Sequence, residues 1–219
     1  MTAFNFEQAR HNMIEQQIRP WDVLDQQVLD TLARVPREDF VPERYRNLAF
    51  SDVAIPLGHG EFMLKPTVEG RLLQALAVKP ADLVLEVGTG SGYLTACLAR
   101  LATRVVSVEI VTDFTDAARS KLKTHGAANA VLHTGDASRG WSGHRYDAIA
   151  VTGSVADVAE EWRQSLKLGG RLFVVAGKPP VMEALLITRT GERAWLRESL
   201  FDTELSPLRN AAPTKAFVF

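Results

Sequence analysis

The sequence predicts an α/β fold with a doubly wound, mostly parallel sheet. After residue 80, short runs rich in Val and Leu alternate with helical patterns, and this alternation is typical of βαβ units. The first run, 83-LVLEV-87, continues into a glycine-rich turn and then a helix, as ligand-binding turns in such sheets do. Two more runs near the end of the chain follow each other closely and indicate an antiparallel edge.

Length and composition fit one folded domain. The chain has 219 residues, of which 46% are hydrophobic and 23% charged, so it can bury a sizeable core. The formal net charge of -1 gives no long-range field that would favour nucleic acid or an anionic membrane. The N-terminus lacks the pattern of a secretory signal, and no run approaches the ~18 apolar residues of a membrane span. We therefore expect a cytoplasmic protein without a nucleic-acid or membrane partner.

The part of the chain before residue 80 is expected to be helical. Apolar residues in 6–18 fall at helical spacing, and Pro20 is expected to end that helix. A second apolar stripe covers 24–35, and a third helix is expected to begin at Pro66, because proline is favourable at the first helical position. The stretch between the second and third helices is expected to be irregular.

That irregular stretch contains the segment 58-GHGEFMLKP-66. Three large apolar residues, Phe62, Met63 and Leu64, follow one another in it. Surface loops normally carry small or polar residues, so such a run either packs inward or is held ready for a ligand.

Seven strands are expected in the remainder of the chain. Five lie at 83–87, 104–109, 130–134, 146–152 and 171–176, and helical segments near 91–101, 112–124 and 157–167 fall between most of them. The last two, 182–190 and 193–201, are separated by little more than Gly191-Glu192 and predict a hairpin. Their order in the sheet is left open.

The glycine-rich turn 86-EVGTGSGYL-94 indicates what the sheet binds. A dinucleotide site reads G-x-G-x-x-G/A, and Tyr93 stands where the third small residue would be required after Gly88 and Gly90. Glu86 ends the strand, and a carboxylate facing the crevice would repel a pyrophosphate and attract an ammonium or sulfonium group. A cationic ligand is therefore favoured over a nicotinamide dinucleotide.

Two more carboxylates follow later strands. Glu109 ends the second strand, where a carboxylate can accept hydrogen bonds from both ribose hydroxyls. Asp136 follows the third strand, where it can accept a hydrogen bond from an adenine amino group. An ammonium group, a ribose and an adenine together describe S-adenosylmethionine, which we expect as the cofactor, with S-adenosylhomocysteine as its product.

The chain resembles the protein-L-isoaspartate O-methyltransferases over most of its length. The matching segments are 15-EQQIRP-20, 35-VPREDFVP-42, 55-IPLGHG-60, 84-VLEVGTGSGYLTACLARL-101, 106-VSVE-109, 135-GD-136, 140-GW-141 and 147-DAIAVT-152. The resemblance implies a seven-stranded Rossmann-like methyltransferase core at 81–219 and an N-terminal helical subdomain with the acceptor loop at 1–80, together one domain. The implied cofactor-binding residues are Glu86, Gly88, Thr89, Gly90, Gly92, Tyr93, Glu109, Asp136 and Ala137.

The reaction implied by the resemblance is methylation of a carboxylate of an isoaspartyl residue in a damaged protein, as a step toward repair. A carboxylate with a pKa of ~4 is ionised at neutral pH and needs no general base, so no catalytic triad is expected. The G-x-S-x-G, P-loop, H-E-x-x-H and C-x-x-C motifs are absent from the sequence, and no metal site is expected.

The acceptor loop, residues 60–64, departs from the family pattern. There the turn continues Gln-Thr-Ile-Ser, whereas this chain has Phe62 at the position of the threonine and Leu64 at that of the active-site serine. Smaller departures are Ala137, where the family usually has Gly, and 153-GSVAD-157, where it has Ala-Ala-Pro-Pro. His59 is a candidate general base for a phenol or amine acceptor.

Three functions remain open at this point. The first is isoaspartyl methylation with an altered acceptor loop. The second is methylation of a different, more apolar acceptor, such as a small molecule, in a pocket lined by Phe62, Met63 and Leu64. The third is a regulatory protein that binds S-adenosylmethionine without turnover. A nicotinamide dehydrogenase is a distant fourth.

Overall fold

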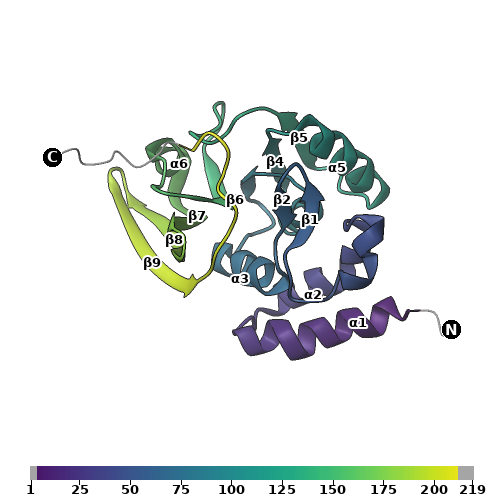
Figure 1. The fold of residues 1–219 in the computed structure, drawn as a ribbon. Coiled ribbons are helices and arrows are strands. Elements are labelled where there is room, and N and C mark those ends of the chain that lie inside the picture. Colours follow the sequence, from purple (N-terminus) through teal and green to yellow (C-terminus); the bar gives the residue numbers. More distant parts are fainter. Residues whose placement is uncertain (1–3, 212–219) are drawn as a thin grey trace.

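The computed structural model describes residues 4–211 and has three layers (Figure 1). Seven strands form one sheet, and helices cover both of its faces. The strands are β3 (Leu83–Val87), β4 (Arg104–Glu109), β5 (Ala130–Thr134), β6 (Tyr146–Val155), β7 (Leu166–Lys178), β8 (Val181–Gly191) and β9 (Ala194–Asp202). All seven expected strands are present, and the doubly wound α/β prediction is confirmed.

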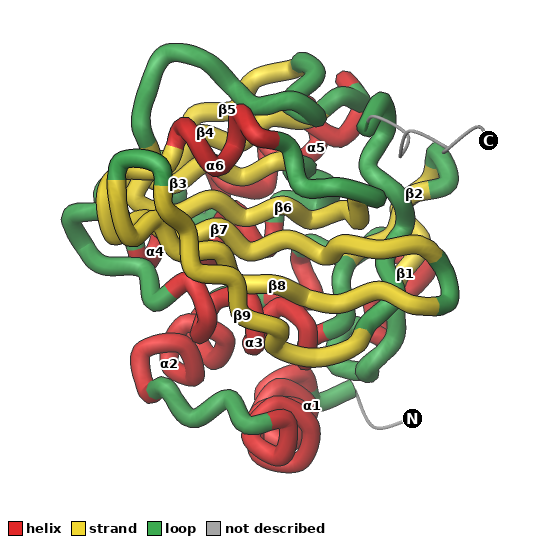
Figure 2. The backbone as a smooth tube through the Cα atoms, turned by 90° about the vertical axis from the view of Figure 1, so that its left-hand side faces the viewer, coloured by secondary structure: helices red, strands yellow, loops and turns green. Residues whose placement is uncertain are grey.

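The sheet order is β5-β4-β3-β6-β7-β8-β9 (Figure 2). The first five of these strands are mutually parallel, and β8 runs antiparallel to both β7 and β9. The predicted hairpin therefore forms the edge, with β9 outermost, which resolves the order that the sequence left open. The strand order reverses at β3, which lies between β4 and β6. Open α/β sheets bind ligands beside such a switch point.

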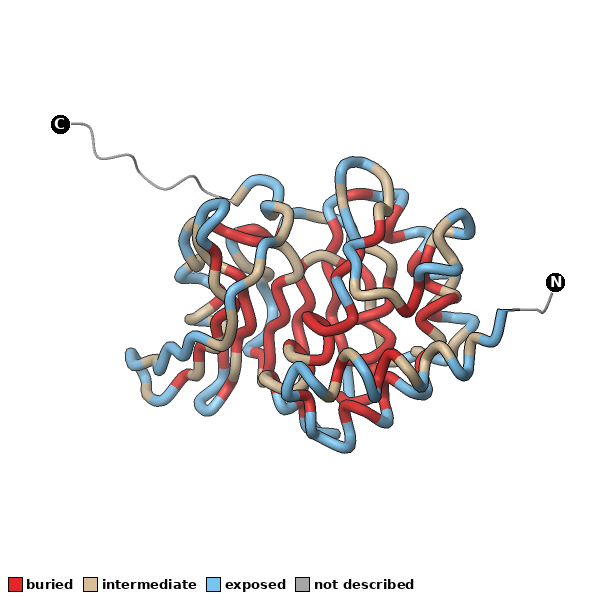
Figure 3. The backbone as a smooth tube through the Cα atoms, turned by 60° about the horizontal axis from the view of Figure 1, so that its bottom comes forward, coloured by how far each residue is buried: buried red, intermediate tan, exposed pale blue. Residues whose placement is uncertain are grey.

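The two faces of the sheet pack against different helices. One core joins Val84 of β3 to apolar residues of α2 (Gln26–Arg34), α3 (Pro66–Leu76), α4 (Tyr93–Leu101) and α5 (Thr112–Thr124). The other joins Leu85, the next residue of β3, to Trp162 of α6 (Glu160–Ser165). Adjacent strand residues point to opposite faces, and both faces are covered, so the central strands are almost wholly buried (Figure 3).

The first helix, which the sequence predicted to end at Pro20, ends one residue later, at Trp21. It begins as α1 (Phe6–Met13), widens into a π-helical turn at Ile14–Ile18 and closes with a 3-10 turn at Arg19–Trp21 that includes the proline. Proline crowds the carbonyl four residues before it, and the wider π turn accommodates that crowding. Between residues 4 and 211, no helix has the length and apolar composition of a membrane span.

The expected loop at 58–66 is partly a hairpin, which corrects the sequence interpretation. Strand β1 (Ile55–Gly58) pairs antiparallel with β2 (Glu61–Met63), and 3-10 turns at Arg37–Asp39 and Glu43–Leu48 precede them. Gly58, His59 and Gly60 have φ values of 107°, 53° and 80°, which only a tight turn with glycines accommodates readily. Of the apolar run, Phe62 is exposed, whereas Met63 and Leu64, the residue after the strand, are both buried.

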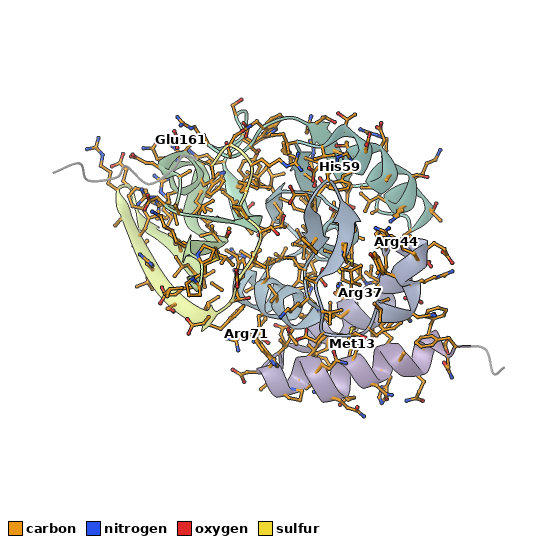
Figure 4. All side chains as sticks on the ribbon, in the orientation of Figure 1. Met13, Arg37, Arg44, His59, Arg71 and Glu161 are labelled. Carbon is orange, nitrogen blue, oxygen red and sulfur yellow. The ribbon has the colours of Figure 1, made fainter. Side chains whose placement is uncertain are left out.

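Arg37 anchors the end of the hairpin, and its side chain is fully buried between the hairpin and the N-terminal helices (Figure 4). Its guanidinium donates to the Ala49 carbonyl at 2.8 Å and to the Leu64 carbonyl at 2.6 Å, and it forms an ion pair with Glu69 of α3. The same guanidinium lies 4.8 Å from the centre of the Tyr93 ring. Burial raises the pKa of the Glu69 carboxyl, and Arg37 opposes that rise.

We expect Arg37→Met to lower the free energy of unfolding by roughly 3–5 kcal/mol, because it leaves the Glu69 carboxyl buried without its partner. The matched control is the double variant Arg37→Met, Glu69→Met, which removes both charged groups. Its free energy of unfolding is expected to fall by less than that of the single variant. Urea unfolding of the three proteins measures this difference. If the free energy of unfolding of Arg37→Met lay within about 1 kcal/mol of the wild-type value, the ion pair would not be what stabilises this region.

Candidate active site

A cavity of about 460 Å³ lies at the carboxyl edge of the sheet. Its walls come from the turn after β3, the ends of β4, β5 and β6, the β1–β2 hairpin and the segment that follows β9. Representative lining residues are Leu57, Phe62, Leu64, Gly88, Gly90, Glu109, Asp136, Ala137, Thr152, Leu205 and Leu208. The cavity therefore joins the expected cofactor edge to the expected acceptor loop.

The glycine turn gives the cavity a floor without side chains. Gly88, Gly90 and Gly92 have φ values of 95°, 51° and 84°. A Cβ on Gly88 would lie 2.2 Å from the Thr152 hydroxyl oxygen, and one on Gly90 would lie 3.3 Å from a methyl carbon of Leu57. The Thr152 hydroxyl thus takes the space beside Gly88, Leu57 takes the space beside Gly90, and both glycines line the cavity with backbone atoms alone.

Glu109 lies at the carboxyl end of β4 and lines the cavity. Its two carboxylate oxygens accept hydrogen bonds from the backbone N–H groups of Gly90 and Val111, each at 2.9 Å. These bonds fix the orientation of the carboxylate and leave lone pairs on both oxygens. Glu109 is thus a preorganised acceptor for neighbouring hydroxyl groups.

Asp136 follows β5 and is exposed on the rim of the same cavity. It accepts hydrogen bonds from the Ser138 N–H at 2.8 Å and from the Asn210 side chain at 3.0 Å. Burial alone would raise the pKa of Asp136, but these hydrogen bonds hold it below its usual value. Asp136 is therefore an ionised acceptor at neutral pH.

Glu86 does not face the cavity, contrary to the expectation from sequence. It is fully buried on the α4 side of the sheet and accepts hydrogen bonds from the hydroxyls of Thr95 at 2.5 Å and Ser107 at 2.6 Å. Burial raises the pKa of this carboxyl to about 8, even though both hydroxyls lower it. A neutral, enclosed carboxyl cannot attract a cationic group directly, so a direct contact with the ligand is not supported.

Three other expected cofactor residues also lie behind the cavity wall. Thr89 shares a hydrogen bond of 2.6 Å with the Ser107 hydroxyl, and Tyr93 is buried over Arg37. Gly92 sits where a Cβ would come within 3.0 Å of the Ala118 side chain, so it allows α4 and α5 to pack closely. None of the three is among the lining residues, whereas Gly88, Gly90, Glu109, Asp136 and Ala137 are.

The acceptor loop forms the opposite wall. Phe62 lines the cavity with 48% of its surface exposed, and Met63 and Leu64 line it with little exposure. Glu61 also lines the cavity, whereas Gly60 belongs to the turn of the hairpin and does not. The structure thus brings the apolar run to the same cavity as Glu109 and Asp136.

His59 is not one of the residues that line the cavity. Its Nε2 lies 3.0 Å from a carboxylate oxygen of Asp113, and its ring packs edge-on to Phe114 at 5.4 Å between centroids. Both partners belong to α5, so this contact tethers the tip of the hairpin to that helix. The geometry gives no support to His59 as a general base.

The segment 203–210, which follows β9, is a part of the site that sequence reasoning missed. Its backbone exchanges hydrogen bonds with Ser154 at the end of β6, from Ser154 N–H to the Ser206 carbonyl at 2.9 Å and from Leu208 N–H to the Ser154 carbonyl at 2.8 Å. Arg209 donates to the Glu61 carboxylate at 2.8 Å and to the His59 carbonyl at 2.6 Å. The segment has no strand or helix periodicity, so pattern analysis had no signal to find it.

Fold and cavity together define a class of protein: Rossmann-like α/β proteins with a nucleoside-binding edge, the class that includes the S-adenosylmethionine-dependent methyltransferases. Residues 8–197 match the family model described as protein-L-isoaspartate(D-aspartate) O-methyltransferase. The chain belongs to this family.

Curated relatives agree with this assignment over nearly the whole chain. The chain is 38% identical over 201 residues to a protein-L-isoaspartate O-methyltransferase from Rhodopseudomonas palustris, covering 91% of this chain and 92% of the relative. It is 39% identical over 177 residues to one from Opitutus terrae, covering 78% and 76% of the two chains.

A solved structure shows the same fold. It comes from Plasmodium falciparum and is described as a protein-L-isoaspartate O-methyltransferase in complex with S-adenosyl-L-homocysteine. The TM-score is 0.81 at 21% identity, over 94% of this chain and 99% of the other. The family resemblance and the Rossmann-like fold expected from the sequence are thus confirmed.

The buried Glu86 predicts how stability depends on pH. Because burial raises the pKa of Glu86 from 4.5 to about 8, the folded state binds a proton that the unfolded state releases. Glu86 therefore contributes its full stabilisation at pH values below its pKa in the unfolded state. This stabilisation is lost as the pH rises toward its pKa in the folded state, over roughly pH 5 to 8. We expect Glu86→Gln, which stays neutral, to flatten the pH dependence of the free energy of unfolding across that range.

Urea unfolding at intervals across this pH range measures the effect. Glu198→Gln, which changes an exposed carboxyl on β9, is the control and is expected to keep the wild-type slope. If the free energy of unfolding changed with pH equally in Glu86→Gln and in the wild type, Glu86 would not be protonated in the folded protein.

Proposed function

We propose that this protein is an S-adenosylmethionine-dependent methyltransferase that esterifies a carboxylate of L-isoaspartyl residues in damaged proteins. One observation carries the proposal. In a chain of this family, the same cavity is lined by a nucleoside-recognising edge, with Glu109 and Asp136, and by the hairpin that contains the 55-IPLGHG-60 segment. As working assignments, we place the protein in the cytoplasm and treat 1–80 and 81–219 as the acceptor and cofactor parts of one domain.

The cofactor edge fits S-adenosylmethionine. Gly88 and Gly90 line the cavity without side chains, so a ligand bound there would lie against their backbone. Glu109 is oriented to accept hydrogen bonds from two ribose hydroxyls, and the ionised Asp136 can accept one from an adenine amino group. Bound there, the cofactor would supply an electrophilic methyl group on a sulfonium sulfur.

The task of the protein is placement and exclusion of water rather than proton transfer. An isoaspartyl carboxylate is already ionised near pH 7 and can act as a nucleophile without a base. The apolar lining residues Phe62, Leu64 and Leu205 would reduce the contact of a bound acceptor with water. In a cavity with few water molecules, a cationic donor and an anionic acceptor attract each other more strongly than in bulk water.

The altered loop sets the expected strength of this activity. Where the family has hydroxyls, Phe62 and Leu64 offer no hydrogen bond to the acceptor carboxylate. The missing bond costs roughly 1–3 kcal/mol, and restoring hydroxyls by Phe62→Thr with Leu64→Ser is expected to raise kcat/KM for a short isoaspartyl peptide about tenfold or more. Affinity for S-adenosylhomocysteine is expected to stay unchanged, because neither residue belongs to the cofactor edge.

The test uses radiolabelled methyl donor with three acceptors in parallel: an isoaspartyl peptide, the matching aspartyl peptide and a small-metabolite extract. We expect base-labile label in the isoaspartyl peptide alone. Label in the metabolite extract alone would indicate a different acceptor. Binding of S-adenosylhomocysteine with no label in any acceptor would indicate a binding protein without turnover.

A further inference from the structure

Asp136, on the cofactor rim of the cavity, is held by hydrogen bonds at both of its carboxylate oxygens. Oδ1 accepts from the backbone N–H of Ser138 at 2.8 Å, and Oδ2 accepts from the side-chain amide of Asn210 at 3.0 Å. The first bond comes from the loop after β5, and the second comes from the segment after β9, 74 residues away in the sequence. Two bonds from different elements fix the plane of the carboxylate, and each oxygen keeps a lone pair for a ligand.

The backbone around Asn210 favours this contact. Its φ is 59°, in the left-handed region that Asn tolerates better than most residues other than Gly. The chain just before it is fixed, because the Leu208 N–H donates to the Ser154 carbonyl at 2.8 Å. The side chain of Arg209 then binds the hairpin at Glu61, whereas that of Asn210 binds the cofactor rim. The left-handed turn thus lets two neighbouring residues serve the two halves of the cavity.

We propose that Asn210 is a positioning residue for the cofactor, which orients Asp136 to accept a hydrogen bond from the adenine 6-amino group. The inference rests on the proposed function and identifies a residue that sets the preference of the site for adenine over other purines. Asn210 is not among the residues that line the cavity, so it acts through Asp136, which is. A fixed carboxylate attracts an amino group and repels a carbonyl oxygen in the same place, so it distinguishes a 6-amino from a 6-oxo purine.

The experiment compares two ligands that differ in the purine. Isothermal titration calorimetry measures the Kd of S-adenosyl-L-homocysteine and that of S-inosyl-L-homocysteine, in which a 6-oxo group replaces the 6-amino group. For wild type, we expect the adenosyl ligand to bind about tenfold more tightly or better, because the inosyl ligand leaves the Asp136 carboxylate without its donor. The ratio of the two Kd values is the adenine preference of the site.

Two substitutions at Asn210 test its role. Asn210→Gly removes the amide without straining the left-handed backbone, and Asn210→Asp keeps the size of the side chain but replaces its donor with a carboxylate. Both are expected to reduce the adenine preference about threefold or more, by weakening the adenosyl ligand. A loosened segment alone would weaken both ligands equally and leave the preference as it is. Asn47→Asp is the matched control, since Asn47 is exposed on the turn Glu43–Leu48, outside the cavity lining, and its substitution adds the same charge.

The possible outcomes separate this inference from the proposed function. A wild-type adenine preference that persists unchanged in Asn210→Gly and Asn210→Asp would overturn the role of Asn210. Equal Kd values for the two ligands in wild type would show that Asp136 does not recognise the 6-amino group, and would overturn the inference while leaving cofactor binding intact. If wild type bound neither ligand, the proposed function itself would fail, and the inference with it.

Discussion

The buried guanidinium of Arg37 is the interaction on which the acceptor side of this protein depends. It binds the carbonyls of Ala49 and Leu64, pairs with Glu69 and lies over Tyr93, so one side chain joins the loop before the hairpin, the end of the hairpin, α3 and α4. Without such a link, a short two-stranded hairpin would be at best marginally stable over an open sheet edge. Arg37 belongs to the 35-VPREDFVP-42 segment that resembles the family pattern. In this structure the segment serves to place the guanidinium that anchors the hairpin.

The two halves of the cavity are built in different ways. The cofactor half follows from the sheet itself, because the switch at β3 opens a crevice and the ends of β4 and β5 place Glu109 and Asp136 on its rim. The acceptor half is assembled from a hairpin and a C-terminal segment far apart in the sequence, joined by Arg209 and Glu61. A change of substrate preference can therefore arise in the hairpin without disturbing the cofactor edge.

The sequence predicted the sheet well, because each strand has its own apolar pattern; β3, β4 and β5 begin and end where expected. It also predicted that Glu109, Asp136 and the run Phe62–Leu64 would meet. It was wrong about the direction of Glu86, since strand alternation turns this residue toward α4, and about the hairpin, which a loop pattern concealed. The segment 203–210 could not be predicted, because its position depends on tertiary hydrogen bonds to Ser154 rather than on local periodicity.

The central claim is that one cavity holds the cofactor against the sheet edge and the acceptor against the hairpin. A crystal structure of the protein with S-adenosylhomocysteine and an isoaspartyl peptide tests it most directly. The account predicts ribose hydroxyls on Glu109, the adenine amino group near Asp136, and the peptide carboxylate between the glycine turn and Phe62. A nucleoside bound away from Glu109 and Asp136, or a peptide bound outside the hairpin wall, would contradict it.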